Sequence, residues 1–263
     1  MKAKKSFKEK YGPWALVAGA SYGLGGAFAE ALARRGLNLV LLARGKAQLE
    51  QSAARLKERY SVDIRCHALD LADYEKTKGI VQNLKVPVGL LVYNAAYAPI
   101  GLFENLSEEQ LALAAAVNVK APLLLAKLLS LQMIQRGQGG IVLMSSLAGG
   151  QGTPRLQTYA ATKAFNAVLA EGLWKELKPR GIDVTACVAG AILTPGYRQA
   201  EKAKAAPGTL SAEQVAEQAL RALGKGPLVV PGAVNKTARF LMSRILPRRA
   251  AISMMDKNTG ALS

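Results

Sequence analysis

Residues 14–25 read WALVAGASYGLG, and this stretch decides the fold. Trp14–Ala18 is apolar throughout, as expected of a strand that is buried on both faces of a parallel sheet. Glycines at 19, 23 and 25 follow at once and open a segment of helical periodicity, Gly25–Arg35. Such a turn brings a ligand close to the free N–H groups of a helix start, which favour an anion. The alternative is a structural turn that binds nothing.

The alternation of strand and helix continues along the chain. Helical periodicity recurs at Lys46–Tyr60 and Tyr159–Leu177, without internal repeats or a low-complexity linker. Further apolar runs predict strands at Asn38–Leu42, Asp63–Ala68, Gly89–Tyr93, Gly140–Ser145, Asp183–Val188 and Pro227–Val230. We therefore predict an α/β fold: a single doubly wound Rossmann-type domain over residues 1–263, with a seven-stranded, mainly parallel sheet flanked by helices.

Composition excludes several classes of protein. Half of the residues are hydrophobic and a fifth are charged, which is typical of a globular chain. The longest apolar run, Ala121–Ile134, is interrupted by Lys127 and is shorter than the roughly 18 residues of a membrane span, so we expect none. Cys66 and Cys187 form no disulfide framework or metal-ligand spacing, which favours a cytoplasmic protein without metal. His67, the single histidine, has no triad partners in view, so Ser-His-Asp hydrolysis is not indicated.

Positive charge is concentrated at both ends of the chain. The net charge is +17, from 35 basic and 18 acidic residues, but no zinc finger, basic zipper or aromatic RNA-binding signature occurs, so we expect no nucleic-acid partner. Residues 1–11 are predicted to form a basic tail and residues 233–263 a basic amphipathic extension. Helical spacing there places Leu241 and Met242 on one face and Arg239 elsewhere. This extension could lie on an anionic membrane, cover a cleft or pack against another subunit.

The residue after the second strand indicates a cofactor. Ala43-Arg44 stands where a carboxylate would accept hydrogen bonds from a ribose 2′-hydroxyl, whereas a cation there pairs with a 2′-phosphate. This favours NADP(H) over NAD(H), with an ordinary solvated arginine as the alternative. Asp70, at the end of the third strand, either accepts from the adenine amino group or caps a helix.

Two Tyr-x-x-x-Lys patterns occur, and their surroundings differ. Tyr74–Lys78 lies on a charged helix and is interpreted as a solvated face, whereas Tyr159–Lys163 follows a buried strand that ends in Ser145-Ser146. Reduction of a ketone requires a proton for the developing alkoxide. A neighbouring ammonium favours phenolate and so lowers the pKa of a tyrosine, and a serine hydroxyl can hold the carbonyl oxygen.

These motifs, in this order, resemble the short-chain dehydrogenase/reductase family over nearly the whole chain. The resemblance implies a catalytic tetrad of Asn118, Ser146, Tyr159 and Lys163, with Tyr159 as general acid/base and Lys163 also holding the nicotinamide ribose. It implies a homodimer or homotetramer built through helices around 107–134 and 157–178. Its cofactor-binding positions are Gly19, Ser21, Tyr22, Gly23, Leu24, Gly25, Arg44, Asp70, Leu71, Asn94, Ala95, Ala96, Ile192 and Thr194, besides Tyr159 and Lys163.

The substrate is less well indicated. A lid is predicted at residues 191–212, and the candidate substrate residues are Leu147, Gln151, Leu156, Leu193 and Tyr197. This mostly apolar set suits a hydrophobic ketone, although apolar loop packing would explain it equally. We predict an NADP(H)-dependent carbonyl reductase/alcohol dehydrogenase. The alternatives are a 3-oxoacyl (CoA or carrier-protein) reductase, a non-catalytic NADP(H)-binding sensor, and a membrane-surface binding protein.

Overall fold

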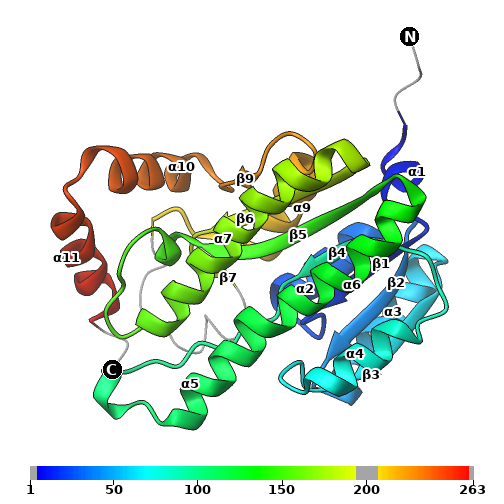
Figure 1. Ribbon diagram of the computed structural model, residues 1–263, viewed down its shortest axis with the longest axis horizontal. Coiled ribbons are helices and arrows are strands. Elements are labelled where there is room, and N and C mark those ends of the chain that lie inside the picture. Colours follow the sequence, from blue (N-terminus) through cyan, green and yellow to red (C-terminus); the bar gives the residue numbers. More distant parts are fainter. Residues whose placement is uncertain (1–4, 194–206, 261–263) are drawn as a thin grey trace.

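The computed structural model describes residues 5–193 and 207–260, and Thr194 and Tyr197 lie outside these ranges. Figure 1 shows one sheet covered by helices on both faces. The strands of this sheet are β1 (Trp14–Ala18), β2 (Asn38–Ala43), β3 (Ile64–Ala68), β4 (Val88–Tyr93), β5 (Gly139–Ser146), β6 (Ile182–Ala189) and β9 (Leu228–Val229). The α-helices are α1 (Phe7–Tyr11), α2 (Gly23–Ala33), α3 (Lys46–Tyr60), α4 (Tyr74–Gln82), α5 (Glu108–Ala115), α6 (Ala121–Arg136), α7 (Gln157–Leu177), α9 (Ala212–Ala222), α10 (Ala233–Phe240) and α11 (Arg248–Thr259).

The sheet is parallel in every pairing of its seven described strands, in the order β3-β2-β1-β4-β5-β6-β9. The strand order reverses between β1 and β4, and in such sheets ligands bind at the carboxyl ends of the strands beside this switch point. The predicted doubly wound fold is confirmed.

The core forms two apolar layers, one on each face of the sheet. One layer packs α2, α3 and α9 against the strands through fully buried side chains such as Phe28 and Leu49. The other packs α4, α6 and α7 through side chains such as Leu125 and Leu129. The strands β1, β2, β4, β5 and β6 are apolar and covered on both faces, which explains why apolar runs in the sequence predicted their positions; β3, at the edge of the sheet, is only partly buried.

A continuous helical segment, Glu108–Arg136, joins β4 to β5. It runs through α5, a π-helical turn at Ala116–Lys120 and α6, and by length and composition alone its 29 residues could cross a membrane. The expectation of no membrane span counted only uninterrupted apolar residues, and this helix passes a test of length and mean hydropathy although Lys127 interrupts it. In this structure α6 packs along β4 and β5 and buries Leu125, Leu129 and Met133 completely, as a core helix does.

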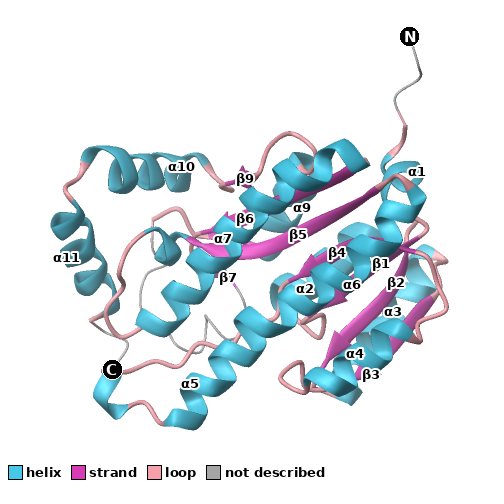
Figure 2. Ribbon diagram, viewed as in Figure 1, coloured by secondary structure: helices cyan, strands magenta, loops and turns pink. Residues whose placement is uncertain are grey.

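The two ends of the chain are more ordered than predicted. Part of the expected basic tail forms α1, whose Ser6–Glu9 capping box satisfies its first turn, and Tyr11 Oη donates to Asp183 at 2.6 Å. The C-terminal extension forms α10, a π-helical turn at Leu241–Ile245 and α11, which lie beyond the ends of β5 and β6 (Figures 1 and 2). Ile192–Leu193 (β7) pairs with Leu210–Ser211 (β8) at the base of the predicted lid.

Candidate active site

A large cleft of about 1200 Å³ opens at the carboxyl ends of the strands. One half is lined by the residues that follow β1, β2, β3 and β4, and the other by the residues that follow β5 and β6 together with the C-terminal helices. Most of the predicted cofactor positions line the first half or the rim of the second: Gly19, Ser21, Tyr22, Gly23, Leu24, Arg44, Asp70, Leu71, Asn94, Ala95, Ala96 and Ile192.

The glycine turn requires glycine at positions 19 and 25 because neighbouring backbone atoms lie too close for a side chain. Gly19 has a φ of +80°, and a Cβ there would lie 2.7 Å from the backbone nitrogen of Ala95. A Cβ on Gly25 would lie 1.8 Å from the carbonyl oxygen of Gly19, so Gly25 supports the turn from beneath and does not line the cleft. The Asn94 side chain donates to the same oxygen at 3.0 Å and fixes the turn.

The start of α2 offers unpaired donors to a ligand. Its N-cap is Tyr22, which makes no side-chain capping bond, so the first N–H groups of this 11-residue helix lack a side-chain acceptor. Arg44 is exposed at the rim of the cleft, directly before the N-cap of α3. These donors and this cation suit the pyrophosphate and 2′-phosphate of NADP(H). Asp70 does not cap α4, because Asp73 does, and Asp70 instead accepts from Ala72 N at 2.9 Å.

The two adjacent serines at the end of β5 have different roles, because successive side chains of a strand point to opposite faces. Ser145 is buried, and its hydroxyl donates to the carbonyl oxygen of Lys163 at 2.7 Å, which ties β5 to α7. Ser146 is partly exposed to the cleft, where its Oγ accepts from Ala148 N at 3.2 Å. The structure thus leaves Ser146 as the serine available to a substrate.

Tyr159 and Lys163 lie one turn apart on α7 and both line the cleft. The Lys163 Nζ lies 5.3 Å from the centre of the Tyr159 ring and donates to the Met144 carbonyl oxygen at 3.1 Å. Burial lowers the pKa of Lys163 to about 8, and it raises the pKa of Tyr159 against a smaller opposing effect of the Ser146 hydrogen bond. The expected lowering of the Tyr159 pKa is therefore wrong, because the removal of water by burial outweighs the hydrogen bond with Ser146.

Asn118 lies in the π-helical turn and is fully buried. Its side-chain amide accepts from Tyr97 N at 2.8 Å and donates to Tyr97 O and Thr162 Oγ1. The backbone carbonyl oxygen of Asn118 accepts from the side chain of Asn166. The side chain is thus fully used in joining α7 to the loop after β4, and it does not line the cleft. We read Asn118 as a positioning residue, and π-helical turns are frequent at such places.

The predicted substrate residues are only partly brought together. Leu147 and Leu156 line the cleft, whereas Leu193 does not, and Gln151 lines a separate smaller cavity with its amide bonded to Leu147 O. Sequence reasoning missed several lining residues from the C-terminal helices: Asn235, Ala238, Met242, Met254, Met255 and Asn258. The sequence left three placements open for this extension, on a membrane, over a cleft or against another subunit. In the structure the extension covers the cleft. Tyr74 is 44% exposed on α4, as its interpretation as a solvated residue required.

Comparison with known proteins agrees with this geometry. The family model described as short chain dehydrogenase matches residues 13–205. The 7beta-hydroxysteroid dehydrogenase of Clostridium sardiniense is 29% identical over 237 residues, which covers 88% of this chain and 90% of that protein. A solved 7beta-hydroxysteroid dehydrogenase superposes with a TM-score of 0.89 at 25% identity and covers 95% of this chain and 99% of that one. A short-chain dehydrogenase from Sphingobium yanoikuyae, solved with NADPH, has a TM-score of 0.78 at 31% identity, with 89% and 96% covered.

Proposed function

Because the chain belongs to the short-chain dehydrogenase/reductase family, we propose that it transfers a hydride between NADP(H) and a hydrophobic ketone or the matching secondary alcohol. The observation that carries this proposal is the convergence of Ser146, Tyr159 and Lys163 on one cleft at the end of β5. A non-catalytic sensor would have no need of Tyr159 and Lys163 in this arrangement.

The cofactor supplies the hydride when it is bound. Tyr159 supplies the proton that the carbonyl oxygen gains during reduction, and it takes that proton back during oxidation. Ser146 donates a hydrogen bond to the same oxygen, which stabilises the negative charge that develops there. Lys163, when protonated, favours the phenolate form of Tyr159 and so assists the transfer in both directions.

We propose NADP(H) rather than NAD(H) on the basis of Arg44. Its guanidinium can pair with a 2′-phosphate in the bidentate manner that favours arginine at phosphate sites. The NADPH-bound relative from Sphingobium yanoikuyae supports this preference.

The substrate proposal rests on the lining of the second half of the cleft. Leu147, Leu156, Met242, Met254 and Met255 present apolar, adaptable surface beside Tyr159. Such a surface favours a bulky apolar ketone over a sugar. The hydroxysteroid dehydrogenase among the relatives supports this substrate class.

We also propose that the protein assembles as a homodimer or homotetramer through α6 and α7. Leu123, Leu131 and Val168 are between 42% and 66% exposed on these two helices, and an assembly through α6 and α7 would bury this apolar surface. A molar mass from light scattering near that of the 27.8 kDa monomer would contradict this assembly.

The first experiment measures NADPH oxidation with a panel of bulky ketones, steroids and 3-oxoacyl thioesters. Tyr159→Phe is expected to lower kcat by about 10²–10⁴-fold, the usual contribution of a positioned acid. Tyr74→Phe is the matched control, because Tyr74 belongs to the second Tyr-x-x-x-Lys pattern on exposed α4. Turnover that survives in Tyr159→Phe would refute the assignment of the acid. Turnover confined to the thioesters would favour the 3-oxoacyl reductase.

A further inference from the structure

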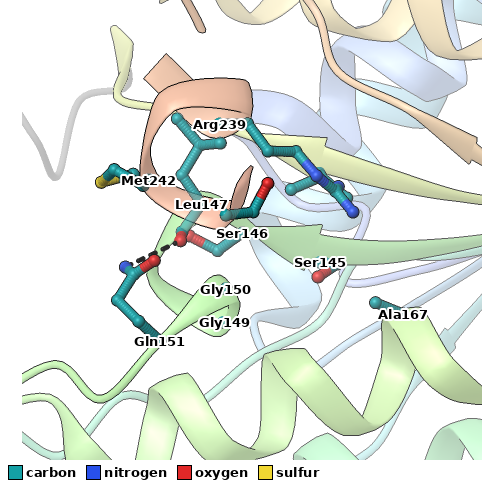
Figure 3. Close-up of a pocket in the computed structure, with 11 residues that line it drawn as sticks. Ser145, Ser146, Leu147, Gly149, Gly150, Gln151, Ala167, Arg239 and Met242 are labelled. Carbon is teal, nitrogen blue, oxygen red and sulfur yellow. Dashed lines mark hydrogen bonds between the residues drawn. The ribbon is translucent and has the colours of Figure 1, made fainter. Parts of the chain in front are cut away.

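A second cavity, of about 130 Å³, adjoins the catalytic half of the cleft. Figure 3 shows its walls: the turn that follows β5, the helix α7 at Ala167, and the C-terminal extension at Arg239 and Met242. Ser145, Ser146, Leu147 and Met242 line both spaces, so the small cavity meets the large cleft at the candidate catalytic serine.

Arg239 is the charged residue that lines this cavity. The sequence placed it on the polar face of the extension, away from Met242, but in the structure Arg239, Met242 and Ser243 line the cavity together. The π-helical turn that begins at Leu241 changes the register of the side chains at this point. Part of the predicted apolar face is therefore exposed on the surface: Leu241 is 44% exposed and Ile245 is 59% exposed.

Arg239 is partly buried and has no hydrogen bond or ion pair within residues 5–193 and 207–260. The other partly buried arginines of these ranges all have partners. Arg35 binds a glutamate, Arg155 binds an aspartate, and Arg136 donates to two backbone carbonyl oxygens. Removing water from a guanidinium without giving it a hydrogen-bond partner costs free energy. We therefore look for the partner of Arg239 in a bound ligand.

No carboxylate in the described ranges forms an ion pair with Arg239. Glu171, on α7, attracts it without forming an ion pair, and burial still lowers the pKa of Arg239 on balance. Among the residues that the structure describes, none that lines the small cavity is acidic, and Asp70, which lines the large cleft, stands in its cofactor half. The described walls of the cavity therefore carry one positive charge, and Ser243 and Gln151 add a hydroxyl and an amide to its lining.

We propose that Arg239 binds a carboxylate of the substrate, so that the enzyme acts on a bulky apolar ketone that also carries an acidic group. This inference rests on the proposed reductase function and specifies its substrate class. The two oxygens of a carboxylate match the fork of a guanidinium, and the apolar side chains of Leu147 and Met242 lie at the junction of the two spaces to contact the body of the molecule. At about 130 Å³ the cavity suits a carboxylate and is too small for a phosphopantetheine arm.

The test is equilibrium binding, which requires no hydride transfer. Phenyl ketones with a terminal carboxylate (3-benzoylpropionate, 4-benzoylbutyrate and 5-benzoylpentanoate) and their methyl esters are titrated calorimetrically into the protein, alone and saturated with NADP⁺. We expect the best acid to bind at least tenfold more tightly than its ester. Arg239→Gln is expected to remove that preference, and Arg239→Lys to retain part of it because the charge stays while the fork is lost.

Arg244→Gln is the matched control, because Arg244 is an exposed cation of the same extension and its loss changes the net charge equally. Equal affinity for acids and esters, an acid preference that survives in Arg239→Gln, an equal loss in Arg244→Gln, or no binding by any member of the series would each overturn the proposal. Tight Arg239-dependent binding without turnover of any ketone would instead contradict the reductase function and leave the carboxylate site standing. Circular dichroism of Arg239→Gln establishes that the variant is folded.

Discussion

Lys163→Met is expected to stabilise the cofactor-free protein while it abolishes turnover. Lys163 is only 3% exposed, and burial lowers its pKa from 10.5 to about 8. At pH 7 Lys163 is therefore protonated in the folded protein, although burial disfavours this charged form. A difference of about 2.5 pH units between the two pKa values corresponds to about 3 kcal/mol of lost stability. Methionine has a similar length and carries no charge, so it avoids this cost.

Part of the gain is offset by the hydrogen bond from Lys163 Nζ to the Met144 carbonyl oxygen, which contributes about 1 kcal/mol. The net expectation is an increase of about 2 kcal/mol in the free energy of unfolding at pH 7. The unfolded chain keeps the lysine proton up to about pH 10.5 and the folded chain only up to about pH 8, so the wild type gains stability as the pH rises between these values. The advantage of Lys163→Met should shrink over the same range and be nearly gone by about pH 9.5.

Urea unfolding of both proteins without cofactor, at pH 7 and pH 9.5, measures this difference. Lys175→Met provides the control, because Lys175 is an exposed lysine of the same helix and should change stability little at either pH. The conclusion that burial destabilises the charged form of Lys163 would be refuted by a variant that is less stable than the wild type at pH 7. A gain in the free energy of unfolding that does not depend on pH would refute it as well.

Three further substitutions test the rest of the site. Gly25→Ala should lower NADPH affinity at least tenfold in a fluorescence titration, since its Cβ would lie 1.8 Å from a backbone oxygen of the glycine turn, whereas Gly26→Ala, with nothing within 4 Å, should leave binding intact. Arg44→Glu should shift the NADPH-to-NADH ratio of kcat/KM at least tenfold toward NADH, and Arg55→Glu, an exposed residue of α3, should not; equal shifts would point to overall charge. Asn118→Ala leaves the backbone N–H and carbonyl of Tyr97 without their partner and removes the donor to Thr162 Oγ1, which still donates to the Tyr159 carbonyl oxygen. It should cost about 2–3 kcal/mol in urea unfolding, and a loss of activity without a loss of stability would argue against a positioning role.

The strands and the cofactor half of the cleft could be predicted from the sequence because their signals are local. β1 was predicted with its exact bounds, and the other sheet strands to within one residue at each end. An apolar run shows burial on both faces, and a glycine turn shows that the backbone must be approached closely. The order of Ser146, Tyr159 and Lys163 was sufficient to place them at one end of the sheet, because α7 follows directly after β5.

Contacts between distant segments were not predictable in the same way. The hydrogen bonds of Asn118 join residues from three different elements, and no spacing in the sequence indicates that its side chain is fully occupied. The direction of the Tyr159 pKa also depends on how much water the folded site excludes, which a neighbouring lysine in the sequence does not reveal.

The sequence by itself determined the parallel sheet, the dinucleotide-binding turn and the serine, tyrosine and lysine of the candidate active site. Each depends on residues that are near one another in the chain or on the periodicity of one element. Only the tertiary structure decided which wall the C-terminal extension builds and that Arg239 faces the second cavity. The reason is physical: the face that a terminal helix buries is set by packing against segments some hundred residues away and by one π-helical turn, and neither leaves a periodic signal in the sequence.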